Sequence, residues 1–462
     1  MSQRWRRVAF VVFLAYLGLA GYILGRFADN AMPLYYVYRP LAAAVPFAFV
    51  IGAVAAWLVP RYAPLAVVVM VGGLCFYSSY DQFLVPILAV GLVALGALVV
   101  ARRRGWRLAT LPSAVSTATA VFVVVFFVSG AARAWLTLEE PVPPVVRGEE
   151  ATGPNVYLVW LDGYPRADTL TNDFGVDNSA FETALAERGF DLYPDAESDR
   201  IHSDYVLLTL LYGSTEGVPP NTDTSPEYQW DIRHRFSLAP LPIEAQEAGY
   251  EWWVIDSPAG FVTFEAGTHV QNGGMNTLEE FMLARSALAP LVKLLVPSWP
   301  TESLREHFQA SLDSVVSLAD SEAHRLVLAH IFEPHLPFLW DANDLPQPVP
   351  DFWPVQSLFV WQIEHVGMTV EEFGELQAGD LQHVNDRVLA MVDEISERDP
   401  SGVIVLFSDH GARYSLELQE TEWPRSFLAA RTPDHPNLFA DDPSPTNILR
   451  TLLPTYITGA SD

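Results

Sequence analysis

The stretch Asn155-Val-Tyr-Leu-Val-Trp-Leu-Asp-Gly163 decides the fold of this 462-residue chain. Residues 156–161 are all apolar or aromatic, and an acid and a glycine follow at once. A short run that is apolar on both faces is typical of a strand buried inside a parallel sheet. The sequence therefore predicts a central strand whose carboxyl end carries Asp162.

Other segments of the second half repeat this pattern and alternate with helical ones. Residues 326–332 and 403–407 are further apolar runs, whereas residues 179–189 and 381–395 carry apolar side chains at helical spacing. A strand, helix, strand, helix order is that of an α/β domain. We therefore expect an αβα domain with a mostly parallel sheet over residues 154–462.

Three polar clusters stand where buried strands should end: Asp162-Gly163, Pro334-His335 and Ser408-Asp409-His410-Gly411. Ligands of open parallel sheets bind beyond the carboxyl ends of the strands, so these clusters should converge. One acid at a strand end is as well explained by a helix cap, and it is the three clusters together that indicate a site. The carboxylates of Asp162 and Asp409 and the imidazole of His410 suit one divalent cation, Mn²⁺ or Zn²⁺, with Ca²⁺ and Mg²⁺ as alternatives.

A hydroxyl nucleophile is predicted at Ser203. It precedes a helix-like apolar run that ends at Gly213, and the positive end of such a helix can hold an anionic group. A serine beside a metal ion loses its proton more easily and can attack phosphorus. Thr209 lies within the apolar run and is interpreted as a packed helix residue.

The first half of the chain has a different composition. Residues 1–130 hold ten of the 27 basic residues and two of the 55 acids, which leaves 17 − 53 = −36 for residues 131–462. That acidity disfavours nucleic-acid binding. The single cysteine, Cys75, excludes an intrachain disulfide and a Cys-rich zinc site.

Apolar runs predict five membrane spans in residues 1–130, each about as long as a helix that crosses the hydrocarbon layer. They cover residues 8–25, 41–59, 63–80, 83–101 and 112–130. A cleaved signal peptide is the alternative for the first run.

The arginines predict how these spans are oriented. Eight arginines fall on one side of the spans and two on the other, which predicts a cytoplasmic N-terminus. An odd number of spans then delivers the second half outside the cytoplasmic membrane. Residues 131–153 are proline-rich and acidic, and we interpret them as a linker.

Four motifs carry a family resemblance. They are Asn155–Asp168, Leu210-Leu-Tyr-Gly213, His330-Ile-Phe-Glu-Pro-His-Leu-Pro-Phe338 and Ser408-Asp-His-Gly411. In this order they resemble the alkaline phosphatase superfamily, in the sulfatase-like branch that includes arylsulfatases, lipoteichoic acid synthases and phosphoethanolamine transferases. The resemblance covers about residues 154–455, and a five-span anchor ahead of such a domain looks like the lipoteichoic acid synthases.

The resemblance implies roles for individual residues. Asp162, Asp409 and His410 would be metal ligands, and Ser203 would be both the nucleophile and a further ligand. His335 would bind the transferred group or protonate the leaving group. His330 and Arg166 would face the substrate, although His330 is also interpreted as a supporting residue and Arg166 as a surface residue.

The same likeness implies an activity: transfer or hydrolysis of a phosphorylated head group, with a membrane lipid as donor and a glycan or glycolipid as acceptor. A sulfatase-type hydrolase is the first alternative. It is disfavoured because Ser203 lacks the Pro-Arg signal that follows the modified residue of arylsulfatases. A catalytically silent surface protein is the second alternative.

Overall fold

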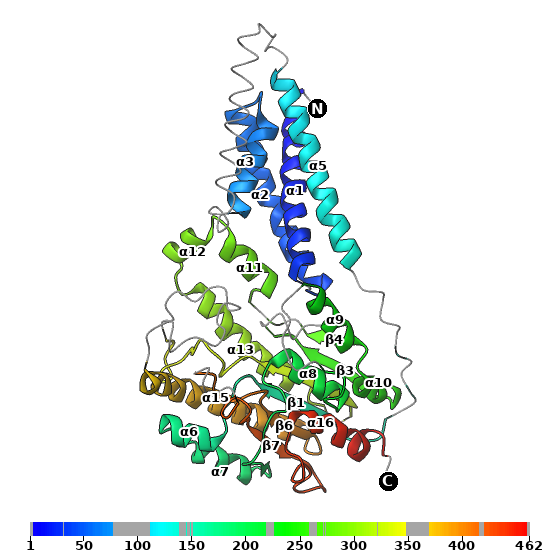
Figure 1. The fold of residues 1–462 in the computed structure, drawn as a ribbon, viewed down its shortest axis with the longest axis vertical. Coiled ribbons are helices and arrows are strands. Elements are labelled where there is room, and N and C mark those ends of the chain that lie inside the picture. Colours follow the sequence, from blue (N-terminus) through cyan, green and yellow to red (C-terminus); the bar gives the residue numbers. More distant parts are fainter. Residues whose placement is uncertain are drawn as a thin grey trace. The chain divides into compact units, whose positions relative to one another are not determined.

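The computed structural model describes residues 3–459 with gaps, and the chain forms two compact units (Figure 1). The helical unit comprises residues 1–139 and 276–297, and the sheet unit comprises residues 140–275 and 298–462. The residues between 3 and 459 that are not described are 31, 77–110, 138–144, 146–147, 149–150, 219–225, 258–265, 271, 273, 321, 348–368 and 415–419.

The helical unit contains three stretches long and apolar enough to cross a membrane within the described residues: Gln3–Asn30, Leu34–Leu58 and Ser113–Thr137. They contain most of the predicted spans at 8–25, 41–59 and 112–130. The structure labels its elements α1 (Gln3–Asn30), η1 (Leu34–Val37), α2 (Tyr38–Leu58), α3 (Ala63–Cys75), α5 (Leu111–Thr137), α11 (Thr277–Arg285) and α12 (Ala289–Leu295).

The described residues thus hold three long apolar helices and not the five that the sequence predicted. The run predicted at 63–80 is the 13-residue helix α3, which is shorter than the about 20 residues that span a bilayer. The polar residues at the end of that run, 77–80, and the whole run at 83–101 lie outside the described residues. Helix α5 continues beyond the predicted boundary at residue 130 to Thr137.

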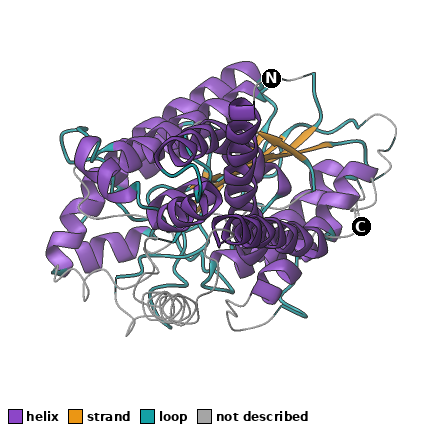
Figure 2. Cartoon of the chain, turned by 90° about the horizontal axis from the view of Figure 1, so that it is seen from above, coloured by secondary structure: helices purple, strands orange, loops and turns teal. Residues whose placement is uncertain are grey.

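The sheet unit is an α/β domain built on one seven-stranded, mostly parallel sheet, as predicted. The strand order is β2-β7-β6-β1-β5-β3-β4, and only β7 runs antiparallel to its neighbours. The strands are β1 (Val156–Leu161), β2 (Asp191–Leu192), β3 (Glu251–Ile255), β4 (Thr268–Val270), β5 (Arg325–Ile331), β6 (Val403–Phe407) and β7 (Leu428–Arg431). Figure 2 shows these strands in orange.

Two groups of helices pack around this sheet, and Figure 1 shows the strands running between them. The first group is α8 (Ser203–Tyr212), α9 (Pro226–Ser237), α10 (Pro240–Glu247) and α16 (Pro445–Leu452), with the short η7 (Leu453–Ile457) after it. The second group is α6 (Ala167–Phe174), α7 (Ser179–Glu187), α13 (Trp299–Ser317) and α15 (Val370–Arg398). The predicted helices at 179–189 and 381–395 correspond to α7 and to the second half of α15.

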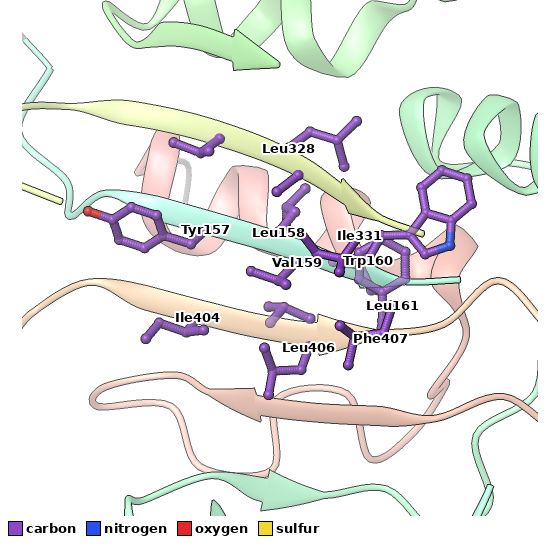
Figure 3. Packing of buried hydrophobic residues seen from close by; sticks show 14 of the residues in the cluster. Tyr157, Leu158, Val159, Trp160, Leu161, Leu328, Ile331, Ile404, Leu406 and Phe407 are labelled. Atoms are coloured by element: carbon purple, nitrogen blue, oxygen red, sulfur yellow. The ribbon is translucent and has the colours of Figure 1, made fainter. Parts of the chain in front are cut away.

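The core is built on β1, the strand that the sequence placed at the centre. All six of its side chains are fully buried. Figure 3 shows those of residues 157–161 among neighbours such as Leu328 from β5 and Leu406 from β6. β1 pairs in parallel with both of these strands. Because β1 is covered on both faces and both edges, it can be apolar throughout.

One buried polar group closes the amino-terminal end of this core. The carboxylate of Asp399, fully buried just before β6, accepts hydrogen bonds from Asn155 Nδ2 at 2.8 Å and from the Tyr157 hydroxyl at 2.9 Å. Asn155 in turn accepts from the backbone N–H of Arg325 at 2.7 Å. The three central strands therefore share one hydrogen-bond network at their start.

Removing this carboxylate should destabilise the whole sheet unit. Asp399→Ala leaves the buried Tyr157 hydroxyl without this acceptor and leaves Asn155 Nδ2 with the carbonyl of Asp320 alone, and we expect a loss of about 3 kcal/mol or more in the free energy of unfolding. Tyr157→Phe should cost less, about 1–2 kcal/mol, because it removes one hydrogen bond to a charged group. Denaturant unfolding of the full chain in detergent micelles measures both values.

Asp393→Ala is the matched control, because Asp393 also lies near the end of α15 but forms an exposed ion pair with Arg188. Its loss should cost less than about 1 kcal/mol. Equal costs for Asp399→Ala and Asp393→Ala would show that the network does not hold the strands together.

Candidate metal centre

The register of the three central strands sets the position of the predicted cluster. Leu161, the last residue of β1, pairs with Ile331 of β5, and Trp160 pairs with Phe407 of β6. The strands thus end level with one another, and the residues that follow them lie at one edge of the sheet. Asp162 follows β1 directly, and Asp409 and His410 follow β6 after one serine.

The structure brings Asp162, Asp409 and His410 together in the interior. His410 Nε2 lies 3.3 Å from Asp162 Oδ1 and 3.5 Å from Asp409 Oδ2. The two carboxylates are fully buried and His410 is buried as well. His335 joins them: one ligand atom each from Asp162, His335 and His410 lie within 4.8 Å of one another.

These side chains fit a divalent cation. Asp162 Oδ1 and His410 Nε2 are buried atoms that have no hydrogen-bond partner among the described residues. The backbone carbonyl oxygen of Gly411 accepts the proton of His410 Nδ1 at 2.7 Å, which leaves the lone pair on Nε2. A lone pair that faces a carboxylate oxygen in the interior is costly unless a positive charge lies between them.

His335 is held in the same tautomer. Its Nδ1 donates to the backbone carbonyl of Leu336 at 2.9 Å, so its Nε2 also carries a lone pair. Burial lowers the pKa of His335 and keeps the imidazole neutral, which is the form that binds metals. The sequence predicted a substrate or acid role for His335, and only its position shows that its Nε2 can also serve as a ligand.

Ser203 also reaches this cluster. It is the first residue of α8, and its hydroxyl donates to Asp409 Oδ2 at 2.5 Å. The other oxygen of Asp409 accepts the backbone N–H of Gly163 at 3.1 Å. The loops after β1 and β6 and the start of α8 are thus joined through one carboxylate.

His330 lies behind the cluster, in the interior of β5. Its Nε2 lies 3.1 Å from Asp162 Oδ2, and its Nδ1 lies 2.5 Å from the hydroxyl of Ser257. Burial would raise the pKa of Asp162, but the imidazoles of His335, His330 and His410 lower it well below its usual value. His330 therefore helps to orient the Asp162 carboxylate, and its supporting and substrate-facing roles both stay predictions.

Arg166 is engaged away from these residues. Its guanidinium forms two 2.7 Å hydrogen bonds with the carboxylate of Asp168 and a longer pair with Glu197 at 3.4 Å. Its Nη1 also donates to the backbone carbonyl of Ala196 at 3.2 Å. These contacts hold α6 to the segment before α8, and the substrate role of Arg166 stays a prediction.

Arg413 is a residue that sequence reasoning missed. It lies in the loop after β6, and its Nη2 donates to the backbone carbonyl of Ile201, just before α8. Burial lowers the pKa of its guanidinium, while Asp409, Asp162 and Asp204 oppose that effect. In the part of the chain that the structure describes, its Nε has no hydrogen-bond partner, so a buried guanidinium lies near the acids with one donor not used by these residues. The sequence does hold one sign of its position, since Arg413 comes two residues after Gly411, the last residue of the Ser408–Gly411 motif.

Comparisons with known proteins were made by sequence and by structure. No protein-family model matches the chain, and no curated protein matches it. Solved structures similar to it include BT1596, a 2-O GAG sulfatase, with 16% identity over 67% of this chain and 72% of that chain and a TM-score of 0.42.

Two further solved structures are also similar to this chain. The C-terminal periplasmic domain of EcEptC from Escherichia coli, in complex with Zn, shares 16% identity over 68% of this chain and 86% of that chain, with a TM-score of 0.39. The phosphonate monoester hydrolase of Agrobacterium radiobacter shares 13% identity over 67% of this chain and 78% of that chain, with a TM-score of 0.39.

Gly163 is required at the centre for two reasons. Its φ is +67°, and a Cβ at this position would lie 3.1 Å from His410 Cε1. Gly163→Ala should cost about 1–2 kcal/mol for the left-handed backbone and should also displace His410. We expect weaker metal binding, measured as the affinity for Zn²⁺ or Mn²⁺ by competition with a chelating dye.

Gly175→Ala is a matched control, because Gly175 has the same φ of +67° and open space around its Cβ position. It should lower the unfolding midpoint to a similar extent and leave metal affinity unchanged. If both variants bind metal as tightly as the parent chain, His410 is not a ligand.

Proposed function

We propose that the chain is a membrane-anchored, metal-dependent phosphotransferase or phosphodiesterase that works through a phosphoserine at Ser203. The observation that supports this proposal most is the 2.5 Å hydrogen bond from the Ser203 hydroxyl to Asp409, beside the unpartnered Asp162 and His410 atoms. A hydroxyl, a proton acceptor and a cation site in one buried cluster are the parts that nucleophilic phosphoryl transfer needs.

Formation of the phosphoserine would be the first step, and each residue of the cluster would have its own role in it. Asp162, His410 and His335 would hold the cation, with Asp409 and Ser203 beside them. The cation, when bound, would supply positive charge that favours the serine alkoxide and the charge that develops on phosphorus oxygens. Ser203 Oγ would lose its proton to Asp409, attack phosphorus, and form an O–P bond as the bond to the lipid alcohol breaks.

The leaving alcohol must gain a proton, and His335 has two competing roles. A nitrogen that holds a cation cannot carry a proton at the same time, so His335 Nε2 serves either as a ligand or as the acid. We favour the ligand role, because burial keeps this imidazole neutral. A water molecule would then give a proton to the leaving alkoxide, and the hydroxide formed would take up the proton held by Asp409. In the second step an acceptor hydroxyl or water would attack phosphorus and give its proton to Asp409, and the Ser203 Oγ–P bond would break as that proton passes to Ser203 Oγ.

Arg413 would bind the transferred group in this proposal. Its guanidinium is buried near Asp162 and Asp409, and none of the described residues pairs with its Nε. A phosphoryl oxygen is the acceptor that suits such a donor. The contact to Ile201 would keep the guanidinium beside the start of α8.

The membrane arrangement is part of the proposal. The first and second long apolar stretches would cross outward and back, and Ser113–Thr137 would cross outward again. Arg61 and the arginines at 102–104 and 107 then share the cytoplasmic side with the N-terminus. An odd number of crossings would leave the sheet unit outside the cytoplasm, whether there are three or, with residues 63–80 and 83–101 included, five. A lipid donor and a glycan or glycolipid acceptor would meet there.

Metal binding should stabilise the chain. Zn²⁺ or Mn²⁺ at about 100 times its dissociation constant should add about 2.7 kcal/mol to the free energy of unfolding, seen as a higher melting temperature in detergent. Asp162→Asn and His410→Gln should abolish this gain because each removes a ligand. His435→Gln, at an exposed histidine, is the control and should keep it. A gain that survives both ligand variants would place the cation elsewhere.

Ser203→Ala should lower phosphodiester turnover by more than about 10³-fold, because no other group can take the nucleophile's part. Intact mass spectrometry of the parent chain after incubation with phospholipid should find the head-group phosphate on Ser203. Thr209→Val is the control, since the Thr209 hydroxyl only bonds the carbonyl of Val206 within the same helix. Hydrolysis of a sulfate ester with no serine adduct would support the sulfatase alternative instead.

A further inference from the structure

Residues 276–297 leave the sheet unit between β4 and α13 and pack within the helical unit. The backbone N–H of Ala287 donates to the carbonyl of Leu74, near the end of α3, at 2.8 Å. Asn276 Nδ2 donates to the carbonyl of Tyr36 at 3.3 Å, and Arg39 pairs with Glu279 at 2.6 Å. This segment, with α11 and α12, is therefore tied to the apolar helices at several points.

The helix α12 presents an apolar face to solvent. Leu291, Leu294 and Leu295 follow the spacing i, i+3, i+4, so they lie on one side of the helix. Their exposed fractions are 49%, 77% and 67%, and Val296 after the helix is also exposed, at 47%. The opposite side is held by Ala289, which is buried. Exposed leucines gathered in this way mark an interaction surface.

The charges of this segment differ from those of its surroundings. Residues 281–301 contain no Asp or Glu and carry Arg285 and Lys293, the only lysine of the chain. Yet residues 131–462 as a whole carry 53 acids against 17 basic residues. An acid-free, basic and leucine-rich segment is the composition of a helix that lies in a membrane surface.

We propose that α12 lies in the membrane–water interface, with Leu291, Leu294 and Leu295 among the lipid acyl chains and Lys293 at the level of the phosphates. This inference rests on the membrane anchoring proposed above and on continuity within the helical unit. The α3 helix, to which the segment is hydrogen-bonded, itself exposes apolar side chains such as Val69. A lipid surface continues that apolar environment, and its phosphates complement the basic residues.

A depth measurement tests the placement. In the full chain with Cys75→Ala, Leu294→Cys is labelled with the fluorophore NBD and reconstituted into vesicles of phosphatidylcholine and phosphatidylglycerol. We expect blue-shifted emission, quenched at least two-fold more by lipids spin-labelled near the head group than by lipids spin-labelled deep in the acyl chain. Glu187→Cys, on an exposed site of α7, should emit as in water and resist both quenchers.

A third label separates this inference from the anchoring itself. Val125→Cys, in the middle of α5, should be quenched most by the deep label if the helical unit crosses the membrane. Quenching at 125 with a water-like signal at 294 would overturn the interfacial placement alone. A blue-shifted signal at 294 without lipid quenching would show that protein, such as a second copy of the chain, covers this face. Absence of quenching at 125 would overturn the anchoring.

Discussion

Two hydrogen-bond acceptors face each other in the interior of the sheet unit, and the site depends on what lies between them. Asp162 Oδ1 and His410 Nε2 are 3.3 Å apart and buried, and no described residue donates a hydrogen bond to either of them. In water each atom would accept a hydrogen bond from solvent, so burying both without compensation costs free energy. A cation bound between them would offset that cost, which is why this pair of atoms makes the cluster a candidate metal site.

The rest of the sheet holds these two atoms in place, because packing along the strands fixes where each strand ends. β5, β1 and β6 end level with one another because their registers are fixed along the whole strand by apolar side chains and, at the other end, by Asp399. A shift of one residue in register would turn buried side chains toward the opposite face. The core that fixes the register therefore also fixes the distance between Asp162 and His410.

The sequence allowed the strands and the acids at their ends to be predicted because both follow from local pattern. β1 and β6 are unbroken apolar runs, and Asp162, Asp409 and His410 come directly after them. The contacts made by His330 and Arg413 could not be predicted, because each depends on residues far away in the chain. His330 is one apolar-flanked histidine among eleven until β5 is placed beside β1 and its ring meets Asp162.

The number of membrane spans was predicted wrongly for a different reason, which is that the ends of the helices could not be located. Hydropathy measures how apolar a run is, but it does not measure where a helix stops. The run at 63–80 is apolar enough at its start, yet the helix α3 ends at Cys75, just before four polar or aromatic residues. Likewise, α5 continues past residue 130 because Ala131-Ala-Arg-Ala134 favours a helix as well as the apolar run does.

The acidity of the second half bears on which substrate the site can serve. A net charge of −36 over residues 131–462 repels a soluble anion and slows its encounter with the site. In the proposed function, a phospholipid in the bilayer that holds the apolar helices would not have to cross that field from bulk solution, since confinement to the membrane would raise its local concentration. Near the acids of the site, Arg413 provides a buried positive charge of the kind that a phosphate group requires. The acidic exterior and the buried arginine beside the acids of the site are therefore consistent with the proposed lipid donor, which would reach the site along the membrane and not through solvent.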